Sequence, residues 1–265
     1  MKRSSGARLC ATAAVGALSL ALITGCSSDS DKGSSDEKGA KGASDTKSSA
    51  PAAAAVGSAE LEKLLLVDGD VKGFKVEKAD DSLPADKSAV KVDKAECEPL
   101  AYALSALPPG DSDALARTTV AEDKAASMET ASPEDLENVD MQDMLDMDVV
   151  LVGLSSYEGD GAQKAVKGVS DAVAACGGGL SMTSEGETQK LTKVTSAKGT
   201  PAGDESTAFS VLTEVEGSPL TVQVEVVRTG GTVATFYAVN LAAMSTGGKA
   251  EVPPAVIEAQ AAKLK

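Results

Sequence analysis

The spacing of apolar residues changes from a helical to an alternating period along the second part of the chain. Apolar residues at helical spacing predict helices over residues 60–67, 94–107, 160–175 and 253–264. Ser132-Pro133-Glu134 is typical of the start of a further helix, which we expect to extend to about Met144. Runs of apolar and β-branched residues predict strands over residues 74–77, 117–121, 149–157, 207–216, 220–229 and 232–239, and strand-like stretches within residues 180–196, notably 190–195.

The order of these elements predicts a fold of the α+β class. In the strand at 220–229, Val222, Val224 and Val226 alternate with polar residues, and Gly230-Gly231 forms a tight turn into the next strand. Strands linked by hairpins, with helices partly segregated from them, predict a single domain with a largely antiparallel central β-sheet flanked by α-helices. This domain covers residues 57–265, and the helix before residue 180 allows one crossover connection.

The first 25 residues have the pattern of an export signal. Lys2, Arg3 and Arg8 precede an uncharged apolar run over residues 9–23, which is too short to span a membrane comfortably. The run ends in Ile23-Thr24-Gly25-Cys26, which matches a lipobox. We therefore predict a lipoprotein whose Cys26 carries the lipid on the extracytoplasmic face of the cell membrane, rather than an ordinary secretory peptide with a chance cysteine. Residues 26–56, rich in Ser, Gly, Lys and Asp, follow as a disordered tether.

The charge and the missing residue types restrict the function. The formal charge is -15, and without Lys2, Arg3 and Arg8 it becomes -18, from 22 basic and 40 acidic residues. Such a chain repels phosphate backbones, so we expect no nucleic-acid partner and contact with the membrane only through the lipid. Histidine is absent, which removes the usual general base and metal ligand. The sequence therefore predicts a protein that is not an enzyme and that uses no cofactor.

Two cysteines remain for the folded part once the signal is removed and Cys26 is lipidated. Cys10 leaves with the signal, so Cys97 and Cys176 form a pair that reads as one disulfide in an oxidising compartment. Closing this loop would stabilise the fold by about 4 kcal/mol in the chain-entropy model. Two unpaired buried thiols or a pair of zinc ligands are the alternatives.

Part of the chain resembles a known family. A cysteine near the domain start, a strand, a helix and a second cysteine (SSYEGDGAQKAVKGVSDAVAAC) precede a meander that contains the hairpin VEVVRTGGTVATF. Together they resemble the PknH-like extracellular sensor domain, which occurs on an actinobacterial receptor kinase and in actinobacterial lipoproteins. The resemblance covers about residues 57–265 and implies a sheet flanked by helices, a ligand cleft and no catalysis. It also implies two disulfides, whereas this chain can form only one, and an aromatic residue that is missing before Cys176. No ligand-contacting residue is therefore carried over.

An acidic segment rich in methionine suggests a second kind of chemistry. Residues 111–148 hold two basic residues, Arg117 and Lys124, and twelve acids: Asp111, Asp113, Glu122, Asp123, Glu129, Glu134, Asp135, Glu137, Asp140, Asp143, Asp146 and Asp148. On a helix, Asp140, Asp143 and Asp146 lie near one face, which is either a Ca²⁺ site or a solvated acidic face. Met141, Met144 and Met147 recur at every third residue. This spacing is compatible with a Cu(I) site, with the lining of a hydrophobic ligand groove or with a plain apolar stripe.

These observations favour a non-catalytic, membrane-anchored binding domain. Its expected partner is a small hydrophobic or envelope-derived ligand, or another protein of the envelope. The alternative function is a metal-handling lipoprotein that uses residues 140–148, with Asp140, Asp143, Met141, Met144 and Met147 as candidate ligands of Cu(I) or Ca²⁺.

Overall fold

The structure, a computed structural model, describes residues 54–80, 83–112, 114–125, 144–215 and 217–265. All of them belong to one compact unit, Ser48–Lys265. The signal, Cys26, the tether up to residue 53 and the predicted helix from Ser132 lie outside the described residues. No helix among those that are described is long and apolar enough to cross a membrane.

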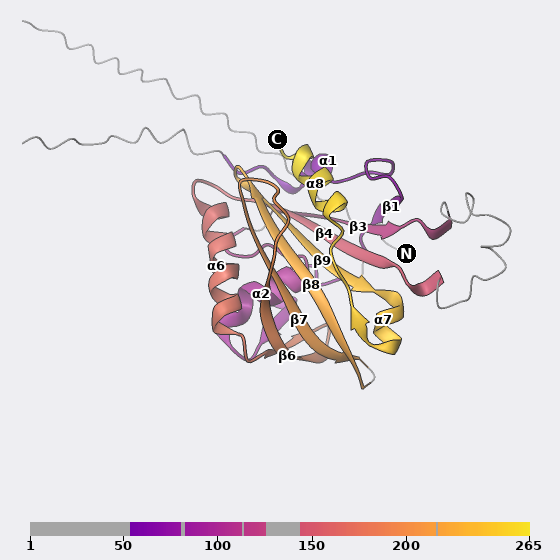
Figure 1. Ribbon diagram of the computed structural model, residues 1–265. Helices are drawn as coiled ribbons and strands as arrows, with labels where there is room; N and C mark the ends of the chain where they lie inside the picture. The colour runs from indigo at the N-terminus through magenta and orange to yellow at the C-terminus, as the bar shows by residue number, and fades with distance from the viewer. Residues whose placement is uncertain (1–53, 81–82, 113, 126–143, 216) are drawn as a thin grey trace, which may run out of the picture. The chain divides into compact units, whose positions relative to one another are not determined.

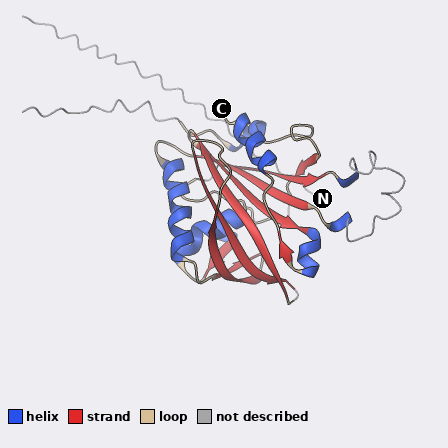
Figure 2. Cartoon of the chain, viewed as in Figure 1, coloured by secondary structure: helices blue, strands red, loops and turns tan. Residues whose placement is uncertain are grey.

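A large antiparallel sheet dominates the described part of the chain, as Figure 2 shows. Its strands are β1 (Phe74–Lys78), β2 (Val90–Val92), β3 (Leu115–Glu122), β4 (Asp148–Ser156), β5 (Leu180–Ser184), β6 (Glu187–Ala197), β7 (Glu205–Val215), β8 (Ser218–Thr229), β9 (Thr232–Asn240) and β10 (Gly248–Lys249). They follow the order β1-β3-β4-β9-β8-β7-β6-β5-β2, and the short β10 pairs with β8 in parallel. The predicted antiparallel sheet with helices is thus present, but strands make up more of the fold than its helices do.

Five helices cover the two faces of this sheet among the described residues. They are α1 (Ser58–Leu64), α2 (Glu98–Leu104), α6 (Gly161–Ala175), α7 (Leu241–Thr246) and α8 (Pro254–Lys263). One core lies between the sheet and α2 with α6, and a second lies between the opposite face and α1 with α8. Figure 1 shows α6 and α2 on one side and α1 next to α8 near the C-terminus. Because α2 contacts the edge strand β2 as well as β8 and β9, the sheet curves around α2 and α6.

Alternation along the central strands explains how one sheet serves two cores. Val222, Val224 and Val226 of β8 point into the first core, as their period predicts. In β9, Val233 belongs to the first core and Phe236 to the second. The residues between the valines of β8 are polar and point to the opposite face of the sheet. They are not all exposed to solvent, since Glu225 is only 1% exposed.

Apart from 3₁₀ turns, three observed elements were not predicted, and one predicted helix was too long. The strand β2, the helix α7 and the strand β10 are too short to show a period. The helix predicted over residues 94–107 consists of a 3₁₀ turn, Ala95–Cys97, followed by α2, which ends at Leu104. There Ser105 Oγ donates to the carbonyl of Ala101, and Ala106 takes a positive φ of 47° that turns the chain away.

Candidate ligand-binding groove

The turn after α2 lies directly on the sheet because β4 carries a glycine at the contact. A Cβ on Gly153 would stand 2.6 Å from the carbonyl oxygen of Ala106, closer than real Cβ contacts. The backbone N–H of Leu107 donates to the carbonyl of Tyr102 at 2.8 Å and fixes the other side of the turn. Leu107 and Pro108 are consequently held, both buried, beside the start of β3.

Three adjoining hollows run along this turn and form what we call the groove. The first, of about 450 Å³, shares Ala85 and Leu115 with a second of about 470 Å³, and shares Lys87 and Ser112 with a third of about 690 Å³. The remaining lining residues are Asp86, Ser88, Leu107 and Pro108 in the first, Ser58, Glu62, Lys78, Ala79, Asp80, Leu83, Ala116 and Arg117 in the second, and Ala55, Asp111, Ala114, Ser156, Tyr157, Glu158, Asp160, Gly161 and Lys164 in the third.

Lys87 connects the two walls of the groove. Its ammonium group donates to the carbonyls of Gly110 and Ser112, the latter at 3.2 Å. The same group lies 5.5 Å from the centre of the Tyr102 ring, within the range of a cation–π contact. Lys87 therefore holds the segment before β2 against the turn after α2.

The floor of the third hollow is a neutral hydrogen-bonded cluster. The Tyr157 hydroxyl donates to the carbonyl of Pro109 and accepts from Ser155 Oγ at 3.1 Å. Tyr157 is 2% exposed, and its burial raises the pKa of the hydroxyl far above its ordinary value. Ser112 Oγ donates to the carbonyl of Ser156 at 2.7 Å. Each of these hydroxyls donates a hydrogen bond to another group of the protein, so together they help to shape the groove.

Arg117 of β3 is the unusual charge in the groove. Its Nη1 donates to the carbonyl of Pro84 at 2.9 Å, and burial lowers the pKa of the half-buried guanidinium. Glu62 and Asp80 line the same hollow, with Lys78 also present. Within the described parts of the chain, however, no carboxylate comes within ion-pair distance of Arg117. No role was predicted for this residue, and its position as one of only two basic residues between residues 111 and 148 was the available signal.

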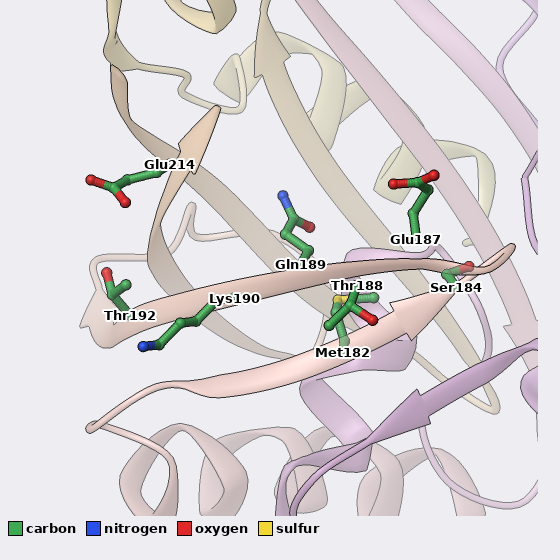
Figure 3. Close-up of a pocket in the computed structure, with 8 residues that line it drawn as sticks. All are labelled: Met182, Ser184, Glu187, Thr188, Gln189, Lys190, Thr192 and Glu214. Carbon is green, nitrogen blue, oxygen red and sulfur yellow. The ribbon is translucent and has the colours of Figure 1, made fainter. Parts of the chain in front are cut away.

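A separate, more polar hollow lies on the sheet at β5 and β6. It measures about 470 Å³ and is lined by Met182, Ser184, Glu187, Thr188, Gln189, Lys190, Thr192 and Glu214. Figure 3 shows Glu187 and Gln189 on one side of β6, with Thr188 and Lys190 on the other, as strand alternation requires. Apart from Met182 its lining is polar, and most of its side chains are exposed, so this hollow offers little surface to an apolar ligand.

The residues predicted as metal ligands are only partly described. Asp140, Asp143 and Met141 lie outside the described residues, while Met144 is exposed and Met147 is half-buried. Asn240 Nδ2 donates to Asp146 at 3.0 Å and to Asp148 at 3.2 Å. No group of three or more acidic or cysteine side chains in the described ranges could hold a metal ion. The Cu(I) or Ca²⁺ site stays a prediction.

The predicted disulfide is present in the structure. Cys97 and Cys176 are joined with a Cα–Cα distance of 6.0 Å. The bond links the 3₁₀ turn before α2 to the end of α6, and both sulfur-bearing residues are buried in the first core. It thereby ties together the two helices that the sheet encloses.

The arginine in the hairpin motif has a structural role. Arg228 Nε donates to Glu205 and Nη1 to Asp204, both at 3.2 Å, and Nη1 also donates to the carbonyl of Gly230. Asp204 in turn accepts from the backbone N–H of Gly230 at 2.8 Å. The arginine of the motif therefore links the start of β7 to the β8–β9 turn through hydrogen bonds.

Comparison with known proteins gives similarity to solved structures and no family. No family model and no curated protein matches the chain. Among solved structures, the chain is similar to the crystal structure of the extracellular domain of PknH from Mycobacterium tuberculosis. The TM-score is 0.47 and the sequence identity 15%, over 80% of this chain and 95% of that chain. At this level of similarity the comparison assigns no function, and the family resemblance seen in the sequence stays a prediction.

Proposed function

We propose that this protein is a lipoprotein anchored to the extracytoplasmic face of the cell membrane, whose domain binds a ligand in the groove without catalysis. Cys26 in its lipobox supports the anchor, and the bond between Cys97 and Cys176 suits an oxidising compartment. The absence of histidine from the whole sequence supports a binding role over acid–base catalysis.

The observation that carries the binding role is the groove itself. Ligand sites in proteins are concave, mostly apolar and provided with a few placed polar groups. The first hollow has this character, with Leu107, Pro108 and Leu115 in its walls. Its neighbour adds Arg117, a half-buried cation without a carboxylate partner among the described residues.

The anchor is tested by changing one cysteine at a time in the full chain. In cells fed an alkyne-labelled fatty acid, we expect Cys26→Ala to abolish labelling and to release the protein from the membrane fraction. The matched control is Cys10→Ala, which removes a cysteine inside the signal and should leave the labelling unchanged. Labelling that persists in Cys26→Ala would contradict the proposed anchor.

The binding role is tested with protein purified from the cells that naturally make it, after release from its lipid anchor. Native mass spectrometry of the chain from residue 27 on, which keeps every described residue, should show bound molecules that denaturing conditions remove. Lipid extracts of the same cells should raise its melting temperature. A mass equal to the bare chain, together with an unchanged melting temperature, would contradict a small-ligand role.

A further inference from the structure

Among the described residues, Arg117 has no carboxylate partner of the kind that a charge in its position ordinarily has. A cation withdrawn from water is ordinarily paired with a carboxylate or held by several hydrogen bonds. The guanidinium offers five N–H donors, and the described residues provide one acceptor, the carbonyl of Pro84. The planar fork of the guanidinium matches the two oxygens of a carboxylate or phosphate. The hollow that contains Arg117 is therefore suited to the anionic end of a ligand.

An apolar wall begins beside this cation. Ala85 and Leu115 belong to both the hollow of Arg117 and the adjoining one of about 450 Å³. Beyond them, Leu107 and Pro108 continue the apolar lining away from Arg117. Since both are held by the turn that lies on Gly153, this wall is fixed in place without a ligand.

We propose that the groove binds an amphiphile with a single acyl chain, whose carboxylate or phosphate head pairs with Arg117 and whose chain lies along Ala85, Leu115, Leu107 and Pro108. The inference rests on the proposed binding function and names its ligand class. A hollow of about 450 Å³ falls within the usual size of small-molecule sites.

The remaining charges determine how such a ligand is held. Glu62 and Asp80 oppose an anion in the second hollow, and Lys78 favours one, while the whole chain carries -15. Long-range attraction therefore does not draw an anion in. Affinity has to come from the short-range pair with Arg117 together with burial of the acyl chain, so that neither part alone suffices.

Titration calorimetry with defined probes tests this requirement on the chain from residue 27 on. Myristate and tetradecyl phosphate have hydrocarbon chains of similar length and differ in the head group. The one that binds with the higher affinity identifies the preferred head group. Acetate and inorganic phosphate present the heads without a chain. We expect both amphiphiles to bind below their micelle-forming concentrations, and neither small anion to bind at those concentrations.

Variants at Arg117 and at the junction of the two hollows locate the site. Arg117→Gln removes the charge and should weaken binding of the amphiphiles at least about tenfold, because it removes a charge-assisted hydrogen bond. Ala85→Trp fills the junction of the two hollows from an exposed position and should weaken binding to a similar extent. Lys193→Gln removes one positive charge from an exposed position on β6, outside the groove, and serves as the matched control. Melting curves verify that each variant is folded.

The outcomes separate this inference from the function on which it rests. Binding that Arg117→Gln and Ala85→Trp weaken, and Lys193→Gln does not, supports the proposal. Equal affinity in Arg117→Gln and the parent chain overturns the assigned site while leaving a binding protein. Absence of amphiphile binding overturns the ligand class, and the native mass measurement above then decides whether any ligand is bound.

Discussion

The Gln260 side chain joins the last helix to the first, since its Nε2 donates to the carbonyl oxygen of Leu64 at 2.7 Å. Its Oε1 accepts from the backbone N–H of Leu66 at 3.1 Å, and Gln260 is fully buried. One side chain of α8 thus satisfies two backbone groups at the end of α1, where a helix leaves such groups without partners.

Replacing Gln260 should destabilise the domain strongly. Gln260→Ala leaves the Leu64 carbonyl and the Leu66 N–H buried without a partner, so we expect the free energy of unfolding to fall by about 2–4 kcal/mol. Urea denaturation followed by circular dichroism measures it. Glu258→Ala, at an exposed position of the same helix, is the control and should change stability by less than about 0.5 kcal/mol. Equal effects of the two changes would contradict the role given to Gln260.

Two glycines should respond in opposite directions to the addition of a methyl group. Gly153→Ala places a Cβ against the carbonyl oxygen of Ala106, and we expect a loss of about 1–3 kcal/mol in unfolding free energy. Gly168 lies inside α6, and a Cβ there would meet nothing within 4 Å. Gly168→Ala should therefore stabilise by about 0.5–1 kcal/mol. Thermal and urea unfolding of both variants measures the difference, and a Gly153→Ala variant at least as stable as the parent chain would show that the turn does not lie on Gly153.

Loss of the disulfide should destabilise the first core. The bond closes a loop with a sequence separation of 79, for which the chain-entropy model gives about 4 kcal/mol. Cys97→Ala with Cys176→Ala should lower the urea midpoint accordingly, and a reducing agent should have the same effect on the parent chain but none on the double variant. A reducing agent that leaves the parent midpoint unchanged would contradict this prediction.

Glu225 should make stability depend on pH in a defined direction. Burial raises the pKa of this carboxyl above its ordinary value of 4.5, although it accepts hydrogen bonds from Thr200, at 2.7 Å from the backbone N–H. The folded state therefore binds the proton more tightly than the unfolded state, and stability falls as pH rises through the folded-state pKa.

The variant Glu225→Gln isolates this contribution, because its amide oxygen can still accept from Thr200 and carries no charge. We expect its unfolding free energy, relative to the parent chain, to be more favourable at pH 7 than at pH 4.5. Urea titrations of both proteins across this range measure the difference. A difference that is constant with pH, or of opposite sign, would contradict the raised pKa.

Local spacing was sufficient to predict most elements but not their neighbours in the sheet. The valines of β8 and the apolar positions of α6 gave the correct element types, because the period of a strand or helix is a local property. The pairing of β4 with β9, which joins Asp148 to Asn240, is decided by packing between distant segments. The same holds for α6, which connects β4 to β5 although four other strands lie between them in the sheet.

The candidate site was harder to predict than the fold for the same reason. Arg117 is one basic residue in an acidic segment, and only the fold places Pro84 and Ala85 beside it, with Leu107 in the adjoining hollow. Glu225 was predicted on a polar face, and the loop that contains Thr200 buries it. The bond between Cys97 and Cys176 could be predicted because the number of cysteines and the expected oxidising compartment restrict the possible pairs.

The order of the strands delays folding until nearly the whole chain has been made. The strand β2 needs β5, β4 needs β9, and the end of α1 needs Gln260, which lies 194 residues beyond Leu66. Contacts of such sequence separation give a high contact order, which slows folding. A ribosome or a translocation channel that still holds the last helix also keeps Gln260 from contacting the end of α1. We therefore expect the domain to complete its fold only once Gln260 is free to reach the end of α1.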